Sequence, residues 1–68
     1  MFYDQLKKAC KTNNISVTEL TRELGMATGN IGSWKNGGHP SIEVLKKIAV
    51  RLNVSTDYLL EIDEYRLD

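Results

Sequence analysis

Helix start and stop signals recur at short intervals along this chain and leave room only for short helices. Ser16, Ser41 and Ser55 are of the residue type that caps helix N-termini. Gly25 and residues 36–38 stand where helices are expected to end, because glycine adopts positive φ without a Cβ clash. No alternation of apolar and polar residues persists long enough for a strand. The sequence therefore predicts an all-α fold.

We expect five helices, each turning one apolar face inward. The first ends near Asn13-Asn14, since asparagine tolerates the left-handed conformation of a helix end. The second opens with a capping box between Ser16 and Glu19 and ends at Gly25, and the fifth begins at Ser55. The inward positions repeat at helical spacing and are Phe2, Leu6, Ala9, Cys10, Val17, Leu20, Leu24, Ile31, Trp34, Ile42, Leu45, Ile48, Ala49 and Leu52.

A chain of 68 residues has room for one domain and a modest core, so we take residues 1–68 as one unit. No titratable pair is spaced for acid-base or nucleophilic chemistry and no phosphate-cradling glycine loop is present, so we expect no enzyme activity. Cys10 and His39 are each alone in their type, and we expect no metal and no cofactor. The sequence has no apolar run that could cross a bilayer and no secretion-signal pattern, so we expect a soluble, cytoplasmic protein without a membrane partner.

The net charge of zero hides an uneven distribution. Residues 1–55 carry eight Lys and Arg against four Asp and Glu, whereas residues 56–68 carry one Arg against five Asp and Glu. A basic body is typical of nucleic-acid-binding domains, although two solvated surfaces without function would give the same pattern. Charge alone therefore leaves both interpretations open.

Residues 17–36 have the pattern of a helix-turn-helix. Two short helices flank a three-residue turn that begins with Gly25, and in such a motif the second helix crosses the first steeply and protrudes. Apolar residues occupy the inward positions of both helices, whereas positions 28–30, 32 and 33 are small and polar. An outward face that buries nothing indicates that the third helix, residues 28–36, presents a docking surface.

The same segment resembles the helix-turn-helix of phage repressors and Cro proteins, the Xre-like group. The resemblance extends from Phe2 to Leu60, because several further segments match in order: Leu24-Gly25-Met26, Trp34-Lys35-Asn36-Gly37, Pro40-Ser41, Leu52-Asn53-Val54-Ser55 and Tyr58-Leu59-Leu60. It implies a compact five-helix, lambda-repressor-like DNA-binding domain. It also implies a transcription regulator, of repressor type, that binds a palindromic double-stranded operator as a homodimer and reads the major groove with the third helix.

The resemblance also implies which residues touch DNA. The residues that would face bases are Thr28, Gly29, Asn30 and Ser33. The residues that would contact backbone phosphates are Ser16, Val17, Thr18 and Asn36, with Lys35 and His39 as added contacts. Because Gly29 and Gly32 offer no side chain, we expect part of the specificity to come from DNA shape. We interpret both glycines as tolerated on an exposed face, with close approach of the backbone to DNA as the alternative.

Some positions depart from the pattern of relatives. Val17 stands where many have a phosphate-binding glutamine, and Thr21 replaces a small alanine, so its hydroxyl needs a partner such as a carbonyl one turn back. Cys10 and Lys35 together replace an arginine and a glutamate that are paired in many relatives. We interpret Cys10 as a buried, unreactive residue and Lys35 as freed to face the DNA backbone.

The acidic segment 56–68 is also rich in apolar residues, and it has more of them than one helix face can bury against so small a domain. We expect it to pair with a second copy of the chain, with a frayed end as the alternative. The candidate interface residues are Leu60, Ile62, Tyr65 and Leu67. Lys46, Lys47 and Arg51 are interpreted as a solvated surface of the fourth helix. The alternative function is a protein-binding adaptor or antitoxin module built on the same fold.

Overall fold

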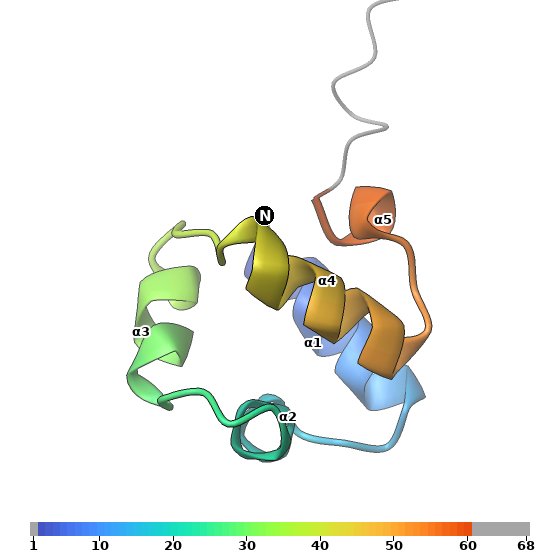
Figure 1. The fold of residues 1–68 in the computed structure, drawn as a ribbon, viewed down its shortest axis with the longest axis horizontal. Coiled ribbons are helices and arrows are strands. Elements are labelled where there is room, and N and C mark those ends of the chain that lie inside the picture. The colour runs from blue at the N-terminus through green and yellow to red at the C-terminus, as the bar shows by residue number, and fades with distance from the viewer. Residues whose placement is uncertain (1, 61–68) are drawn as a thin grey trace, which may run out of the picture.

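The computed structural model describes residues 2–60, and five helices account for most of this range (Figure 1). They are α1 (Phe2–Thr12), α2 (Val17–Glu23), α3 (Gly29–Lys35), α4 (Ile42–Leu52) and α5 (Thr56–Leu60). No strand occurs within residues 2–60. The prediction of an all-α, five-helix domain is confirmed.

The helix ends follow the predicted signals. Ser16 Oγ accepts a hydrogen bond from the Glu19 amide at 3.0 Å, and the Glu19 carboxylate accepts one from the Ser16 amide at 3.4 Å, which completes the capping box. Ser41 Oγ caps α4 by accepting from the Val44 amide at 3.3 Å. Gly25 adopts a φ of 73°, as expected for a glycine that ends a helix. These local contacts mark both ends of α2 and the start of α4.

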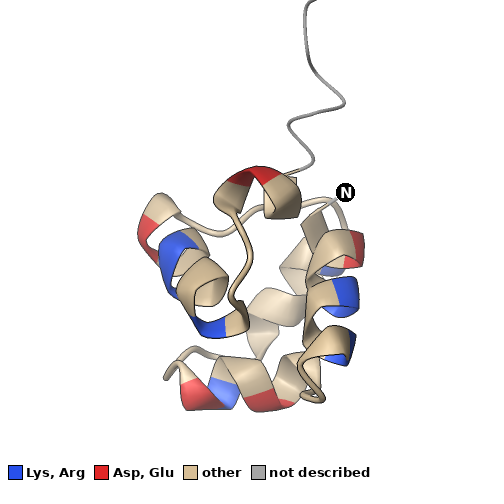
Figure 2. Ribbon diagram, turned by 90° about the vertical axis from the view of Figure 1, so that its right-hand side faces the viewer, with Lys and Arg blue, Asp and Glu red and all other residues tan. Residues whose placement is uncertain are grey.

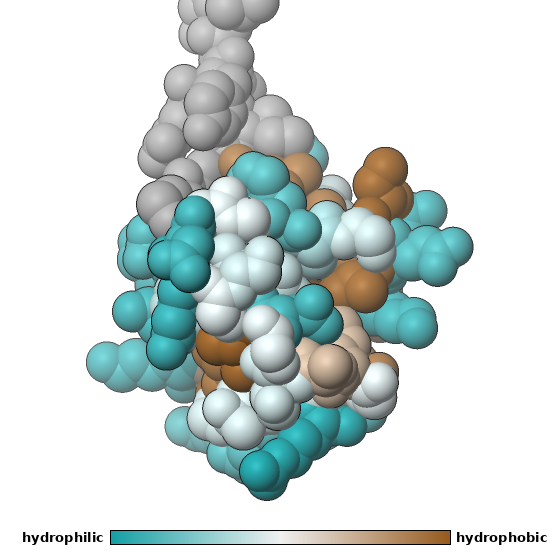
Figure 3. Space-filling model, turned by 90° about the vertical axis from the view of Figure 1, so that its left-hand side faces the viewer, coloured by the Kyte–Doolittle hydropathy of each residue, from teal (hydrophilic) through white to brown (hydrophobic). Residues whose placement is uncertain are grey.

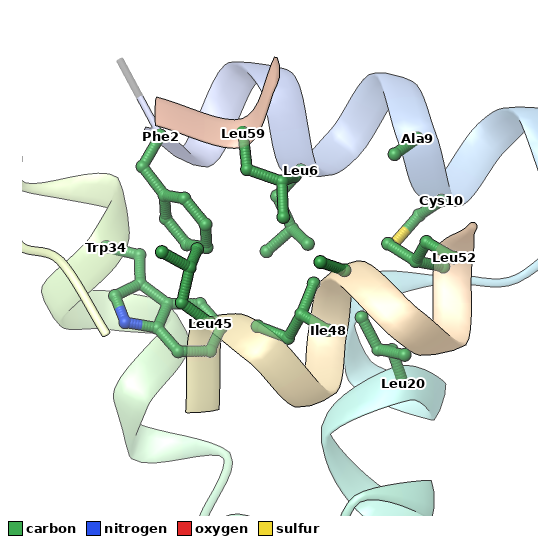
Figure 4. Close-up of a cluster of buried hydrophobic side chains, with 11 residues drawn as sticks. Phe2, Leu6, Ala9, Cys10, Leu20, Trp34, Leu45, Ile48, Leu52 and Leu59 are labelled. Atoms are coloured by element: carbon green, nitrogen blue, oxygen red, sulfur yellow. The ribbon is translucent and has the colours of Figure 1, made fainter. Parts of the chain in front are cut away.

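A cluster of buried side chains lies between the helices (Figure 4). Its members are Phe2, Leu6, Ala9, Cys10, Leu20, Trp34, Leu45, Ile48, Ala49, Leu52 and Leu59. Helix α1 lies in the middle of the domain, since it contacts α2, α3 and α5. Trp34 is only 3% exposed, so it is a core residue, as its helical spacing predicts. This core fixes α2 and α3 on one side of the domain.

The prediction of a core position is wrong for one residue of α4. Ile42 was expected to face inward with the other apolar residues of α4, but its side chain is 72% exposed. It lies on the first turn of α4, and helix side chains tilt toward the N-terminus, so it projects beyond the turns that cover the core. The buried stripe of α4 therefore begins at Leu45.

Candidate nucleic-acid interface

Helices α2 and α3 are held in place by buried residues and by a hydrogen-bonded turn. Leu20 and Thr21 of α2 are fully buried, and Trp34 anchors α3. Between the helices, the Met26 amide donates to the Thr21 carbonyl at 2.9 Å. The Thr21 hydroxyl donates to the Thr18 carbonyl at 2.8 Å, which confirms the predicted partner one turn back. The buried hydroxyl of Thr21 therefore has a hydrogen-bond partner within the same helix.

The opposite side of α3 is exposed and polar. Every residue at the candidate base-contact positions is exposed, namely Thr28, Gly29, Asn30 and Ser33, together with Gly32. Ile31 is partly buried against the core between them. Figure 3 looks onto this side of the domain, where most of the surface is white or teal and the apolar surface is confined to smaller areas. The α3 side is therefore an exposed polar surface of small residues.

The hydrogen bonds of these side chains differ. Thr28 occupies the N-cap position of α3 in an αR conformation and makes no side-chain cap hydrogen bond. Asn30 Nδ2 donates to the Ala27 carbonyl at 3.1 Å, and Asn36 Nδ2 donates to the Gly32 carbonyl at 3.0 Å. The Thr28 hydroxyl is thus available to a ligand without breaking a capping bond, whereas the two asparagine amide groups already have an internal partner.

The loop after α3 closes tightly onto the helix. The Gly38 amide donates to the Ser33 carbonyl at 2.9 Å. A Cβ atom on Gly38 would lie 2.5 Å from Ser33 Oγ and 2.8 Å from the Ser33 carbonyl oxygen, so only glycine fits. Sequence reasoning interpreted Gly38 as a helix stop and missed this approach, because the contact depends on how the loop returns. The next residue, His39, is exposed.

The candidate phosphate contacts at the start of α2 are accessible. Ser16 and Thr18 are exposed, and Val17 is partly buried. The Ser16 hydroxyl already caps α2, so a contact between this hydroxyl and a phosphate would be made by a group that also stabilises the helix.

Lys35 lies beside α1 as well as at the end of α3. Its Nζ is 5.9 Å from the centre of the Tyr3 ring, and Lys7 Nζ is 5.2 Å from the same ring. Cys10 is buried, as predicted, and burial raises the pKa of its thiol, an effect that the nearby Arg51 charge opposes. Sequence analysis missed Tyr3 and Lys7, although their spacing of four residues is a signal that the two side chains share a helix face.

Charged groups are distributed unevenly around the helix pair. Residues 24–42 contain no Asp or Glu, so no acidic side chain comes from α3 or the loops on either side of it. Glu23, at the end of α2, is paired with Arg51 of α4, whose Nη2 donates to Glu23 Oε1 at 3.2 Å. Arg51 is exposed, which agrees with its interpretation as part of a solvated surface, and it also makes this ion pair. Lys46 and Lys47 are exposed.

Of the candidate dimer residues, Leu60 is partly buried against its own core. Ile62, Tyr65 and Leu67 lie outside the described residues. Within residues 2–60, no group of three or more His, Cys, Asp or Glu side chains could hold a metal ion. Across the same range, none of the helices combines the length and apolar character that a membrane span requires.

A five-helix domain in which α2 packs into the core through Leu20 and Thr21 while α3 exposes a polar face has the arrangement of a helix-turn-helix DNA-binding protein. A family model described as helix-turn-helix matches residues 6–59, which is most of the chain. The chain belongs to this family of transcription regulators, the Cro/C1-type or Xre-like helix-turn-helix proteins. No curated protein and no solved structure matches the chain.

Proposed function

We propose that this protein is a sequence-specific transcription repressor that reads the DNA major groove with α3. The observation that carries the proposal is the exposed polar side of α3, on which Thr28, Asn30 and Ser33 provide hydrogen-bonding groups. The major groove admits one helix, and residues near the N-terminus of that helix reach the base edges. Thr28 is the leading candidate, because its hydroxyl serves no capping bond.

Phosphate contacts would flank this reading surface on both sides. Ser16, Val17 and Thr18 lie at the start of α2, and Asn36 and Lys35 at the end of α3. His39 follows on the loop that Gly38 ties to α3. Contacts of this kind set the register of the protein on the duplex, while the base contacts supply sequence information.

The proposed active form is a homodimer on a palindromic operator. Two recognition helices in successive major grooves must lie about 34 Å apart, and a two-fold pair of subunits meets that requirement. Leu60, Ile62, Tyr65 and Leu67 are the proposed contacts between the copies. Sedimentation of the full chain checks this: we expect a dimer that the double substitution Tyr65→Ser and Leu67→Ser shifts toward monomer.

Selection from random DNA duplexes, followed by gel shifts with the enriched sequences, tests DNA reading. We expect a palindromic consensus, and we expect Thr28→Ala to weaken binding to that consensus by about 1–3 kcal/mol while nonspecific binding is unchanged. A control is Thr56→Ala, which makes the same substitution at the start of α5, outside the proposed contacts with DNA. Failure to enrich any sequence at low salt would overturn the proposal and favour a protein-binding module.

A further inference from the structure

The lysines of α1 divide into two groups by their neighbours. Lys7, Lys8 and Lys11 are all exposed, and Figure 2 shows basic residues along α1 at the edge of the domain above α2. Lys8 Nζ donates to Gln5 Oε1 at 3.3 Å, and Gln5 Nε2 donates to the Tyr58 carbonyl at 3.1 Å. Lys8 is therefore turned toward α5, away from the helix-turn-helix.

Lys7 is turned the other way, toward α3. Its ammonium lies 5.2 Å from the Tyr3 ring centre, and the Lys35 ammonium from α3 lies 5.9 Å from the same centre. A ring of this kind attracts a cation to its face, so Tyr3 gathers two cations that come from different helices. Tyr3 therefore holds two like charges together, with Asp4 of the same helix lining a groove beside Lys7.

The same edge continues to the start of α2. Lys7 and Lys11 line a shallow groove together with Ile15, Ser16 and Val17. Along this edge, Lys35, Lys7 and Lys11 follow one another from the end of α3 across α1 to the groove beside α2. A row of cations suits a polyanion whose charges also follow one another, and a DNA backbone carries one negative charge per about 3.4 Å of each strand.

We propose that Lys7 binds a backbone phosphate of the same duplex that α3 reads, with Tyr3 as the positioning residue that holds Lys7 and Lys35 side by side. The proposal rests on the proposed function, and it extends the DNA interface from the helix-turn-helix onto α1. The three lysines form a phosphate-binding edge, defined by Lys7, Lys11 and Lys35. Tyr3 is partly buried and contacts DNA only through the lysines that it orients.

The salt dependence of binding tests the edge. Fluorescence anisotropy with the selected duplex is measured from low to high salt for Lys7→Gln and for the matched control Lys8→Gln, which removes the same charge from the same helix. We expect Lys7→Gln to lower the salt slope by about one, the value for one lost phosphate contact, and Lys8→Gln to leave it unchanged. Equal slopes for the two variants would overturn the proposal.

Substitution of Tyr3 separates positioning from simple charge. Tyr3→Phe keeps the ring and should keep the wild-type slope, whereas Tyr3→Leu keeps an apolar side chain, loses the ring and should reduce the slope. Both variants are compared after thermal melts show that they are folded. If Tyr3→Leu binds with the wild-type slope, the positioning role is wrong. If the wild-type protein selects a duplex but Lys7→Gln does not change the salt slope, only this inference is wrong. If the wild-type protein selects no duplex, the proposed function is wrong as well.

Discussion

The Phe2 ring meets the Trp34 indole edge to face, with centroids 5.4 Å apart and ring planes at 83°. Phe2 is the first residue of α1, and Trp34 lies in the last turn of α3. Both are 3% exposed, so the contact closes one end of the core (Figure 4). The orientation of α3, and with it the candidate reading surface, therefore depends on a residue near the start of the chain.

Phe2→Ala should destabilise the domain strongly. The substitution removes a buried aromatic ring together with its edge-to-face contact, and losses of this kind amount to about 3–5 kcal/mol. Urea unfolding followed by Trp34 fluorescence gives the free energy directly.

Ile42→Ala is the matched control, because Ile42 is an apolar residue of a helix first turn that is 72% exposed. It should change the unfolding free energy by no more than about 0.5 kcal/mol. A comparable loss for both variants would mean that the Phe2–Trp34 contact contributes nothing particular to the fold.

The helices and their ends could be predicted because their signals are local. The capping box of Ser16 and Glu19 and the positive φ of Gly25 each depend on a few neighbouring residues. The prediction for Ile42 was wrong because it also used a local pattern: helical spacing alone does not show where the elements that cover the core end. Periodicity assigns a face to a residue, and only the tertiary structure shows whether that face is covered there.

The contacts that shape the candidate site were harder to predict. Arg51 pairs with Glu23 from a different helix, and the Gly38 amide returns to Ser33 through a loop. Such contacts depend on how the helices pack, which no short sequence pattern encodes. The exposed face of α3 could be predicted, because it is the complement of the apolar positions on the same helix.

Gly32→Ala should stabilise the protein by about 0.5–1 kcal/mol, because nothing lies within 4 Å of the added Cβ and alanine favours a helix interior. Gly38→Ala should destabilise it, because the added Cβ would collide with Ser33. Thermal melts of the two variants check both signs. If Gly32 is merely tolerated, the affinity of Gly32→Ala for the selected duplex also stays within about threefold of wild type, or about 0.7 kcal/mol. A larger loss would support close approach of the α3 backbone to DNA.

Acidification should weaken the tie between α2 and α4. The hydrogen bond and the charge of Arg51 lower the pKa of Glu23 below its ordinary value. The ionised carboxylate is therefore favoured in the folded state, so its contribution is present above the ordinary glutamate pKa of about 4.3 and is lost as the pH falls through the lower folded value. Both side chains are exposed, so salt should reduce the effect.

Urea midpoints of wild type and Glu23→Gln between about pH 5 and pH 3 measure this contribution, since the window spans the ordinary glutamate pKa. The wild-type curve should fall more steeply than that of the variant, and the two should converge at the acidic end. Parallel curves across the whole window would show that the pair does not couple proton binding to folding.

Loss of the Ser16 cap should affect DNA binding as well as stability. Ser16→Ala and Ser55→Ala each remove a side-chain acceptor that lies 3.0 Å from a backbone amide of the following helix. Each should cost about 1 kcal/mol in unfolding free energy, because an amide at the helix start loses its partner. Ser16 lies among the proposed phosphate contacts, whereas Ser55 precedes α5 and is not among them. At a temperature where both variants are folded, only Ser16→Ala should therefore weaken binding to the selected duplex. Equal affinities for the two variants would remove Ser16 from the interface and leave it as a helix cap.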